Sequence, residues 1–411
     1  MKDIFQRIDE DMGPLGRYAD QAEGYYIFPE LEGELSNRMH FQGKEVIVWS
    51  VNNYLGLAND PEVRKVDTAM GEKFGIAYPM GSRMMSGNTS MHRELENELS
   101  TFVRKEDSVL LNFGYQGIMS AIDSLLSRRD VVVYDAGCHA CIVDGVRMHS
   151  GKRFVFQHND IASLEKQLKT ATEVAKDTGG GILVISEGVF GMRGDQGKLK
   201  EIVALKSEYN FRLMVDDAHG FGTLGHDGSG AGTEQGIQDE IDVYFATFAK
   251  AMGSIGAFIS GDKNVVKYIK YNMRSQIFAK SLPSIVVGGA LYRLKEIMAS
   301  TSRKDKLWEN VNMLQKGLVE AGFDIGNTNS CVTPVYMHGS VEEAMVLVKD
   351  LRDNHSIFCS IVVYPVIPKG LILLRLIPTA VHNADDIHET IEAFKEVKVK
   401  LENHVYQKQL A

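Results

Sequence analysis

The chain has 411 residues, of which 44% are hydrophobic and 24% charged, and its formal net charge is −9. This length fits a large domain plus a smaller one, and the acidic balance argues against nucleic acid as the main partner, because phosphates need clustered Lys and Arg. No apolar run is long enough for a transmembrane helix, and the charged N-terminus lacks a signal-peptide core, so we expect a cytoplasmic location.

Residues 1–55 predict an N-terminal arm, largely helical, that leads into a short strand at Glu45–Ser50. From 56 to 285, short apolar runs alternate with helical patterns such as Ile161–Thr170, which follows the capping residue Asp160, and Leu199–Tyr209. This alternation predicts a large α/β domain with a mostly parallel sheet that is covered on both faces. The expected strands are Val109–Asn112, Val131–Tyr134, Ile182–Ile185, Phe211–Val215, Val243–Thr247 and Ala257–Ser260.

The pattern changes near residue 286, and the segment from 286 to 411 predicts a smaller C-terminal α/β domain. Helices and strands are again expected to alternate there. They are a helix through Ile285–Ala299, a strand in CVTPVYM (331–337), a helix over Val341–Asn354, strands around Ile361–Tyr364 and Leu371–Ile377, and a last helix over Ala384–Glu402.

Polar and ionisable side chains stand directly after several predicted strands of the large domain. Ligands of open α/β sheets gather at the carboxyl ends of the strands, so we expect these side chains to meet at one edge. They belong to Gly114-Tyr115-Gln116, Asp135 to His139, Glu187-Gly188, Asp216 to His219, and Thr247 to Lys250.

Lys250 and the VDDAH segment are the strongest candidates for chemistry. Lys250 lies between two apolar strands, where partial desolvation makes an amine a better nucleophile, although an exposed turn lysine is the alternative. Asp216 follows a buried strand and therefore needs a positive partner, which a protonated pyridinium nitrogen supplies. The alternative is a metal site built from Asp216, Asp217 and His219, which lacks a further cluster of hard ligands.

Three further positions carry weaker signals. His139 is suited to stack on an aromatic cofactor, or it is an ordinary loop histidine. The turn at Gly114 and Tyr115 opens a helix, where backbone N–H groups bind phosphate, or its glycine has a steric role only. Arg375 lies within the apolar run LILLRLIPT and needs an anion, which is either a substrate carboxylate or an internal Asp or Glu.

Two motif matches are read as structural. Gly220, Gly222 and Gly225 match the letters GxGxxG, but the sequence after them is a poor helix former, so a loop is predicted. Cys138 and Cys141 have CxxC spacing without a second ligand pair, so we expect two ordinary thiols and no metal site.

Taken in order, six motifs between about residues 40 and 400 resemble the α-oxoamine synthases. This group of pyridoxal phosphate (PLP) enzymes has the aminotransferase-like fold (fold type I) and includes serine palmitoyltransferase, 8-amino-7-oxononanoate synthase and glycine C-acetyltransferase. The motifs are VNNYLGL (51–57), GSRMMSGNTSMHRELE (81–96), DAGCHACIVDG (135–145), EGVFGMRGD (187–195), VDDAHGFGTLG (215–225) and TFAKAMGSIGAF (247–258).

The resemblance implies a role for each matching position and a homodimer with its site at the subunit interface. Lys250 is expected to form the Schiff base with the PLP aldehyde. The other implied roles are Asp216 at the pyridine nitrogen, His219 at the ring hydroxyl, His139 stacked on the ring, Gly114, Tyr115 and Thr247 at the phosphate, Asn52 and Arg375 at the amino-acid carboxylate, and residues 278–281 near the partner's phosphate.

Four positions depart from the family pattern and bear on the phosphate contacts and the acyl-carrier fit. Ala249, Cys141 and Gly191 each stand where the family usually has Ser, and Lys280 replaces a small polar residue.

The resemblance implies a C-acyltransferase that condenses an amino acid with an acyl thioester, on CoA or a carrier protein, with loss of carbon dioxide. GSRMMSG favours the palmitoyltransferase and oxononanoate branches, whereas YPVIPKG (364–370) resembles glycine C-acetyltransferase. We favour long-chain acyl transfer to serine or cysteate, in sphingolipid or sulfonolipid synthesis. The reason is that Met80, Met84 and Met85 could line an acyl channel, unless they are core residues. The alternatives are glycine C-acetyltransferase, an aminotransferase on the same fold, or a binding protein without the chemistry.

Overall fold

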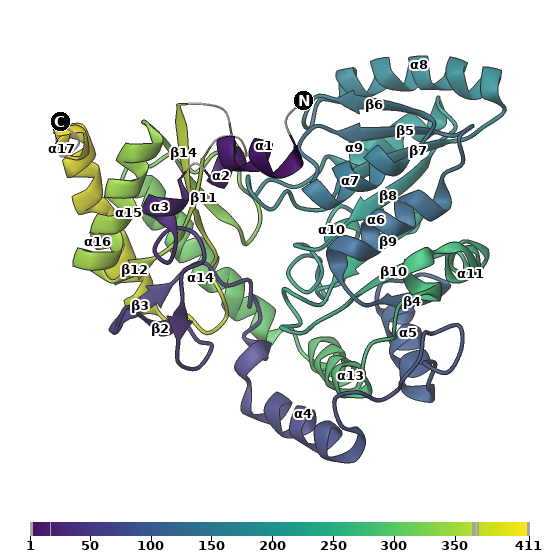
Figure 1. Cartoon of the computed structure of the whole chain (residues 1–411), viewed down its shortest axis with the longest axis horizontal. Coiled ribbons are helices and arrows are strands. Elements are labelled where there is room, and N and C mark those ends of the chain that lie inside the picture. The colour runs from purple at the N-terminus through teal and green to yellow at the C-terminus, as the bar shows by residue number, and fades with distance from the viewer. Residues whose placement is uncertain (1–2, 17, 364–366, 368–369, 409–411) are drawn as a thin grey trace. The chain divides into compact units, whose positions relative to one another are not determined.

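The computed structural model describes the chain except residues 1–2, 17, 364–366, 368–369 and 409–411 (Figure 1). It forms two compact units. The large unit comprises Asn52–Glu309 and Asn327–Cys331, and the small unit comprises Met1–Val51, Asn310–Gly326 and Val332–Ala411. The boundaries of these two units differ from the predicted domain boundaries at residues 55 and 285. The division into three domains stays a prediction.

In the described part of the large unit, seven strands form one sheet in the order β4-β10-β9-β8-β7-β5-β6. Strand β10 is antiparallel to both of its neighbours, and the remaining pairs are parallel. The predicted mostly parallel sheet is therefore confirmed. The strands are β4 (Asp107–Leu111), β5 (Val131–Asp135), β6 (Lys152–Phe156), β7 (Ile182–Glu187), β8 (Arg212–Asp216), β9 (Val243–Thr247) and β10 (Ala257–Gly261). Of these, β6 was not among the predicted strands, because its exposed Lys152 and Arg153 mask an apolar pattern.

Helices bury side chains against this sheet. Val132 and Ile185 pack with Ile118 and Ile142 of helices α6 and α7 in one core cluster. Side chains of alternating positions such as Val133 point to the opposite face and are also buried, so both faces are covered. The helices of the large unit include α4 (Pro61–Phe74), α5 (Ser90–Phe102), α6 (Gly114–Leu125), α7 (Ala140–Met148), α8 (Ile161–Thr178), α9 (Leu199–Ala204), α10 (Ala231–Glu234), α11 (Lys263–Asn272), α12 (Arg274–Ile277) and α13 (Ser284–Ala299).

Capping explains where the predicted helix after residue 160 begins. The Asp160 side chain accepts a hydrogen bond from the Ser163 N–H at 2.9 Å, which satisfies a backbone donor of the first turn of α8. The GxGxxG segment is a series of turns, as predicted, and not the start of a long helix.

The small unit contains two sheets, β1-β2-β3-β12 and β11-β14-β13, which pack with helices around a core that includes Trp49 and Phe394. The predicted helices before and after β14 are confirmed, whereas β1 and β2 were not expected. The elements are α1 (Ile4–Glu10), α2 (Gly13–Gly16), α3 (Ala19–Ala22), β1 (Leu31–Glu32), β2 (Arg38–Phe41), β3 (Lys44–Val48), β11 (Thr333–His338), α15 (Val341–His355), β12 (Ile357–Phe358), β13 (Ser360–Val362), β14 (Leu371–Leu376), α16 (Ala384–Glu402) and α17 (Val405–Lys408).

Helix α14 (Ser302–Glu320) was missed in the sequence, and its residues are divided between the two units. Most of YPVIPKG, including Tyr364 of a predicted strand, lies outside the described residues. Among the residues that are described, no helix is both long and apolar enough to cross a membrane.

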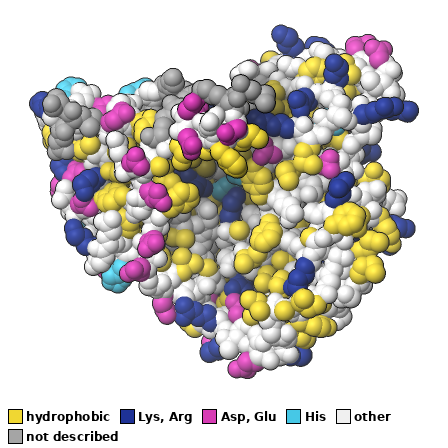
Figure 2. Space-filling view, viewed as in Figure 1, with side chains coloured by type: hydrophobic (Ala, Val, Ile, Leu, Met, Phe, Trp, Pro, Cys, Tyr) yellow, Lys and Arg dark blue, Asp and Glu magenta, His cyan; other side chains and the backbone are white. Residues whose placement is uncertain are grey.

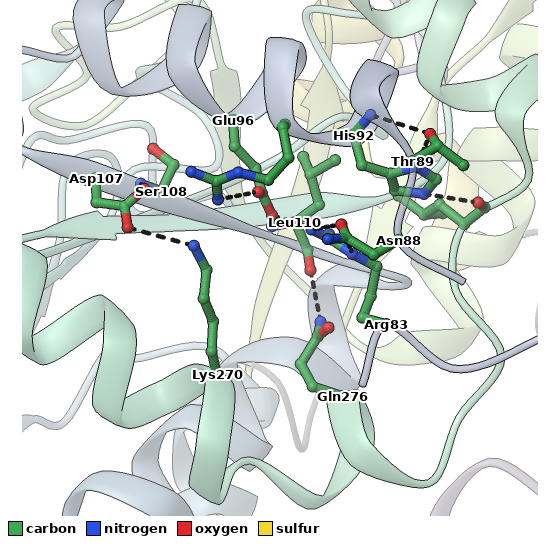
Figure 3. A network of polar contacts seen from close by, with 12 residues as sticks. Arg83, Asn88, Thr89, His92, Glu96, Asp107, Ser108, Leu110, Lys270 and Gln276 are labelled. Atoms are coloured by element: carbon green, nitrogen blue, oxygen red, sulfur yellow. Dashed lines mark hydrogen bonds and ion pairs between the residues drawn. The ribbon is translucent and has the colours of Figure 1, made fainter. Parts of the chain in front are cut away.

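A buried carboxylate holds the GSR segment of the large unit in place (Figure 3). Glu96 is fully buried and accepts hydrogen bonds from Arg83 at 2.8 Å, from Arg93 at 2.8 Å and from the Leu110 N–H at 3.0 Å. Arg83 also donates to Asn88 at 3.1 and 2.9 Å, which closes the loop between them. Buried ions are tolerated only when paired in this way, so the segment has one defined conformation.

Replacing Glu96 with Gln should therefore destabilise the protein. The amide keeps the shape but leaves two guanidinium groups without their shared negative charge, at a cost of about 3 kcal/mol. Urea denaturation measures this loss. The control is Glu94→Gln on the same helix, whose partner Lys295 lies 2.9 Å away on the exposed surface, and it should leave the midpoint nearly unchanged. Equal midpoints for the two variants would contradict the assignment.

Candidate active site

The predicted convergence at one edge of the sheet is found within the large unit. Strands β4, β5, β7, β8 and β9 run in the same direction, because β10 is antiparallel to both β4 and β9. Their carboxyl ends therefore lead into the candidate residues at a single edge. These residues are Gly114, His139, Glu187, Asp216 and Lys250.

Electrostatic coupling shows that Lys250, Asp216 and His139 lie near one another. Burial raises the pKa of Asp216, while the charge of Lys250, the backbone N–H of Ala218 and the charge of His139 oppose this shift. Asp216 is 5% exposed, and Lys250 is half-buried. A carboxylate in this position is costly to ionise without a cation, so the site is suited to a positively charged ligand group.

Glu187 is a second buried carboxylate at this edge, and sequence reasoning gave it no role. Its Oε1 accepts the backbone N–H of His139 at 2.5 Å. Burial and the neighbouring charge of Asp216 raise the pKa of Glu187 well above its ordinary value. The position of Glu187 at the end of a strand was a signal in the sequence. The sequence did not reveal that its carboxylate accepts a hydrogen bond from the His139 backbone.

His219 is buried and lies 2.6 Å from the Tyr54 hydroxyl through its Nδ1 atom. Tyr54 belongs to the VNNYLGL motif, yet its contact was not predicted. The other side of the His219 ring explains why Gly191 stands where the family usually has Ser. A Cβ atom at Gly191 would lie 2.2 Å from His219 Nε2, so glycine is required as the backbone is placed here.

The start of α6 is arranged as an anion site. A Cβ atom at Gly114 would lie 3.0 Å from Thr247 Oγ1, which shows that the two strand ends touch. The side chain of the N-cap residue Phe113 makes no capping hydrogen bond to the first turn of the helix. The N-terminus of a helix with exposed N–H groups favours phosphate. Tyr115 lies on this first turn, and its hydroxyl donates to Asp144.

The His139 ring lies beside the Cys141 thiol, a neighbour that the family pattern does not have. Its Nδ1 atom lies 2.9 Å from Cys141 Sγ and accepts the Cys141 N–H at 3.3 Å. The cysteine therefore stands in for the usual serine beside this ring. Cys138 and Cys141 are both buried free thiols.

The alternative metal site does not form. Asp217 accepts hydrogen bonds from the Tyr244 hydroxyl and from the Ala231 N–H, both at 2.8 Å. Its carboxylate is thereby directed to the segment that follows the GxGxxG turns. No three His, Cys, Asp or Glu side chains in the described parts of the chain are grouped to hold a metal ion.

The two residues predicted at the substrate carboxylate belong to different units. Asn52 is the first residue of the large unit and is half-buried. Arg375 lies on β14 of the small unit and is 7% exposed, so its predicted burial is confirmed. Their shared role stays a prediction.

The methionines of the GSR segment are not core residues. Met80, Met84 and Met85 are 75%, 65% and 77% exposed. Figure 2 shows patches of hydrophobic side chains on the face turned to the viewer, over the part of the large unit where Figure 1 places α5 and α13. Contiguous exposed apolar surface is typical of interaction sites.

Residues 44–394 match the family model for aminotransferase class I and II. The chain is 64% identical to a cysteate-C-fatty acyltransferase of Capnocytophaga ochracea, over 99% of this chain and 97% of that protein. It is 33% identical to a serine palmitoyltransferase of Sphingobacterium spiritivorum, over 92% and 93% of the two chains. A solved serine palmitoyltransferase of Sphingomonas wittichii superposes with a TM-score of 0.89 at 27% identity, covering 96% of this chain and 98% of that one.

The chain belongs to the aminotransferase class I and II family. Within that family it is an α-oxoamine synthase, since these relatives cover nearly its whole length. The resemblance on the six motifs is thereby confirmed for the family and for the fold.

Proposed function

We propose that this chain condenses cysteate with a long-chain acyl thioester and releases carbon dioxide and the free thiol. The supporting observation is the 64% identity to a cysteate-C-fatty acyltransferase, against 33% to a serine palmitoyltransferase. Identity of that degree over the whole chain favours the same amino acid as well as the same reaction. Glycine C-acetyltransferase, suggested by YPVIPKG alone, is not favoured by these relatives.

The large unit carries a donor set that fits PLP. The start of α6 beside Gly114, Tyr115 and Thr247 suits the phosphate, and the amine of Lys250 suits the aldehyde. Asp216 is a buried carboxylate that favours a cationic ring nitrogen. When bound, PLP supplies an electron-withdrawing ring that stabilises negative charge at the amino-acid Cα.

We assign the remaining steps to the chain's own residues. Lys250 Nζ would remove the Cα proton, and the buried Asp216 carboxylate would stabilise a positive charge that faces it, which favours negative charge at Cα. His139 would cover one face of the bound cofactor, and His219, whose Nδ1 lies 2.6 Å from the Tyr54 hydroxyl, would contact its ring hydroxyl. Asn52 and Arg375 bind the carboxylate, which leaves as carbon dioxide after the acyl carbon has bonded to Cα and the thiol has departed.

We also propose a homodimer whose interface contains exposed apolar side chains. They belong to two segments, residues 78–85 and 278–284, which are hydrogen-bonded to each other. Ser281 N–H donates to Gly81 O at 2.9 Å, and Ser284 N–H donates to Tyr78 O at 2.8 Å. Phe278, three residues before Ser281, is 80% exposed. A second copy would cover this surface, and light scattering coupled to size exclusion measures the mass. The cytoplasmic location stays a prediction.

A substrate panel tests the function. Purified protein with PLP is given palmitoyl-CoA, palmitoyl-carrier protein, acetyl-CoA or a keto acid together with cysteate, serine, glycine or alanine, and thiol release and product mass are recorded. We expect kcat/KM for cysteate to exceed that for serine by about 10-fold or more. Faster condensation of glycine with acetyl-CoA would overturn the proposal, as would amino-group transfer to a keto acid without thiol release.

A further inference from the structure

His158 lies between two carboxylates in the turn that joins β6 to α8 of the large unit (Figure 1). Its Nδ1 atom is 2.8 Å from Asp135 Oδ1, and its Nε2 atom is 2.9 Å from Asp195 Oδ2. Asp135 is almost fully buried, and the imidazole ring is 18% exposed. A neutral imidazole carries only one N–H, so it donates to both carboxylates only as the imidazolium ion.

The residue after it strengthens the same junction. The backbone N–H of Asn159 donates to Asp135 Oδ2 at 2.9 Å, and its side-chain amide donates to Asp195 Oδ2 at 2.9 Å and to Gln196 O at 3.0 Å. The Phe190 ring meets the His158 ring edge-on at a centroid distance of 4.4 Å. The turn at 157–160 therefore ties the loop after β5 to the loop after β7.

Both of these loops reach the candidate active site. The first runs from Asp135 to His139, whose N–H is held by Glu187. The second, residues 188–195, is closed by hydrogen bonds of Phe190 N–H to Asp195 O at 2.9 Å and of Gly194 N–H to Phe190 O at 2.8 Å. Gly191 in this loop packs directly on His219.

We propose that His158 is a positioning residue whose imidazolium ion fixes the His139 loop relative to the Gly191 loop. It does not touch the reacting groups itself. The inference rests on the proposed function for its catalytic consequence, but the junction is a property of the protein without cofactor.

The charge state of His158 follows from its surroundings. Burial lowers the pKa of His158, but the hydrogen bonds and charges of Asp135 and Asp195 outweigh it and raise the pKa to about 9. Because this folded-state pKa lies above the ordinary value of 6.5, the stabilisation is fully present below about pH 6.5 and is lost as the pH rises through about 9.

The test compares His158→Gln with His149→Gln in the full chain. His149 is an equally suitable control because it is buried and contacts the backbone carbonyl of Asp130 at 3.0 Å, at the other end of β5. Hydrogen–deuterium exchange is followed over 136–139 and 188–197, with and without PLP. We expect about 10-fold faster exchange in both loops for His158→Gln alone. We also expect about 10-fold weaker PLP retention and a lower kcat with little change in KM.

Asp195→Asn provides a second measurement that does not depend on His158→Gln being folded. Removing one of the two negative charges should shift the alkaline loss of stability to lower pH by about one unit. Unchanged exchange in both loops, equal effects in His149→Gln, or an unshifted pH profile would each overturn the inference. Exchange and pH stability need no turnover, so their success with an inactive wild type would count against the proposed function only.

Discussion

Lys250→Ala should abolish condensation, with kcat/KM lowered at least about 10,000-fold, together with the visible absorbance band of lysine-bound PLP. The reason is the position of Lys250 in the fold. Lys250 follows β9 at the carboxyl edge of the sheet, half-buried and within electrostatic range of Asp216 and Glu187. Absorbance spectra and the thiol-release assay measure the two effects on the same preparation.

Lys105→Ala is the matched control. Lys105 is also a half-buried lysine of the large unit, but its ammonium donates to the carbonyls of Gln238 and Ile241 at 2.5 and 2.6 Å, before the start of β9. This variant should lose stability and keep the absorbance band. Retained turnover in Lys250→Ala would show that another nucleophile does the chemistry, whereas a wild-type protein with neither the band nor turnover would indicate a fold-sharing binding protein.

Asp216→Asn should lower kcat/KM about 1,000-fold while making the cofactor-free protein slightly more stable. Burial raises the pKa of Asp216, so an ionised carboxylate is unfavourable there until a cation faces it. The amide keeps the shape and the hydrogen bond from the Ala218 N–H, which is 3.0 Å long, but it cannot hold a positive ring nitrogen. Steady-state kinetics measure the loss of kcat/KM, and thermal unfolding without PLP measures the gain in stability.

The neighbouring Asp217→Asn is the control for this prediction. Burial raises the pKa of Asp217 to about 7, and its side chain binds Tyr244 and Ala231. We expect this variant to keep activity within a few-fold of wild type, because the hydrogen-bond partners of its carboxylate, Tyr244 and Ala231, are not candidate site residues. Equal losses in both variants would show that the effect is one of folding and that Asp216 has no special role.

The sequence by itself determined six of the seven described strands in the sheet of the large unit and the residues that follow them. Strands buried on both faces appear as continuous apolar runs, so Val243–Thr247 and its neighbours were readable without a structure. Since each chemical residue comes directly after such a strand, Asp216, His139 and Lys250 could be placed at one edge. The ordered motifs supplied the family, because several matches in sequence are far more specific than any one of them.

The tertiary structure decided which side chains meet. Tyr54 contacts His219 across 165 positions, and Asp195 contacts His158 across 37. No periodicity in the sequence encodes such pairs, because they depend on strand order and on loop paths. The same holds for the exposure of Met84 and Met85, where an apolar residue type indicated core or channel equally well. Hydrophobic pattern specifies elements locally, whereas contacts between loops arise only after those elements have packed together.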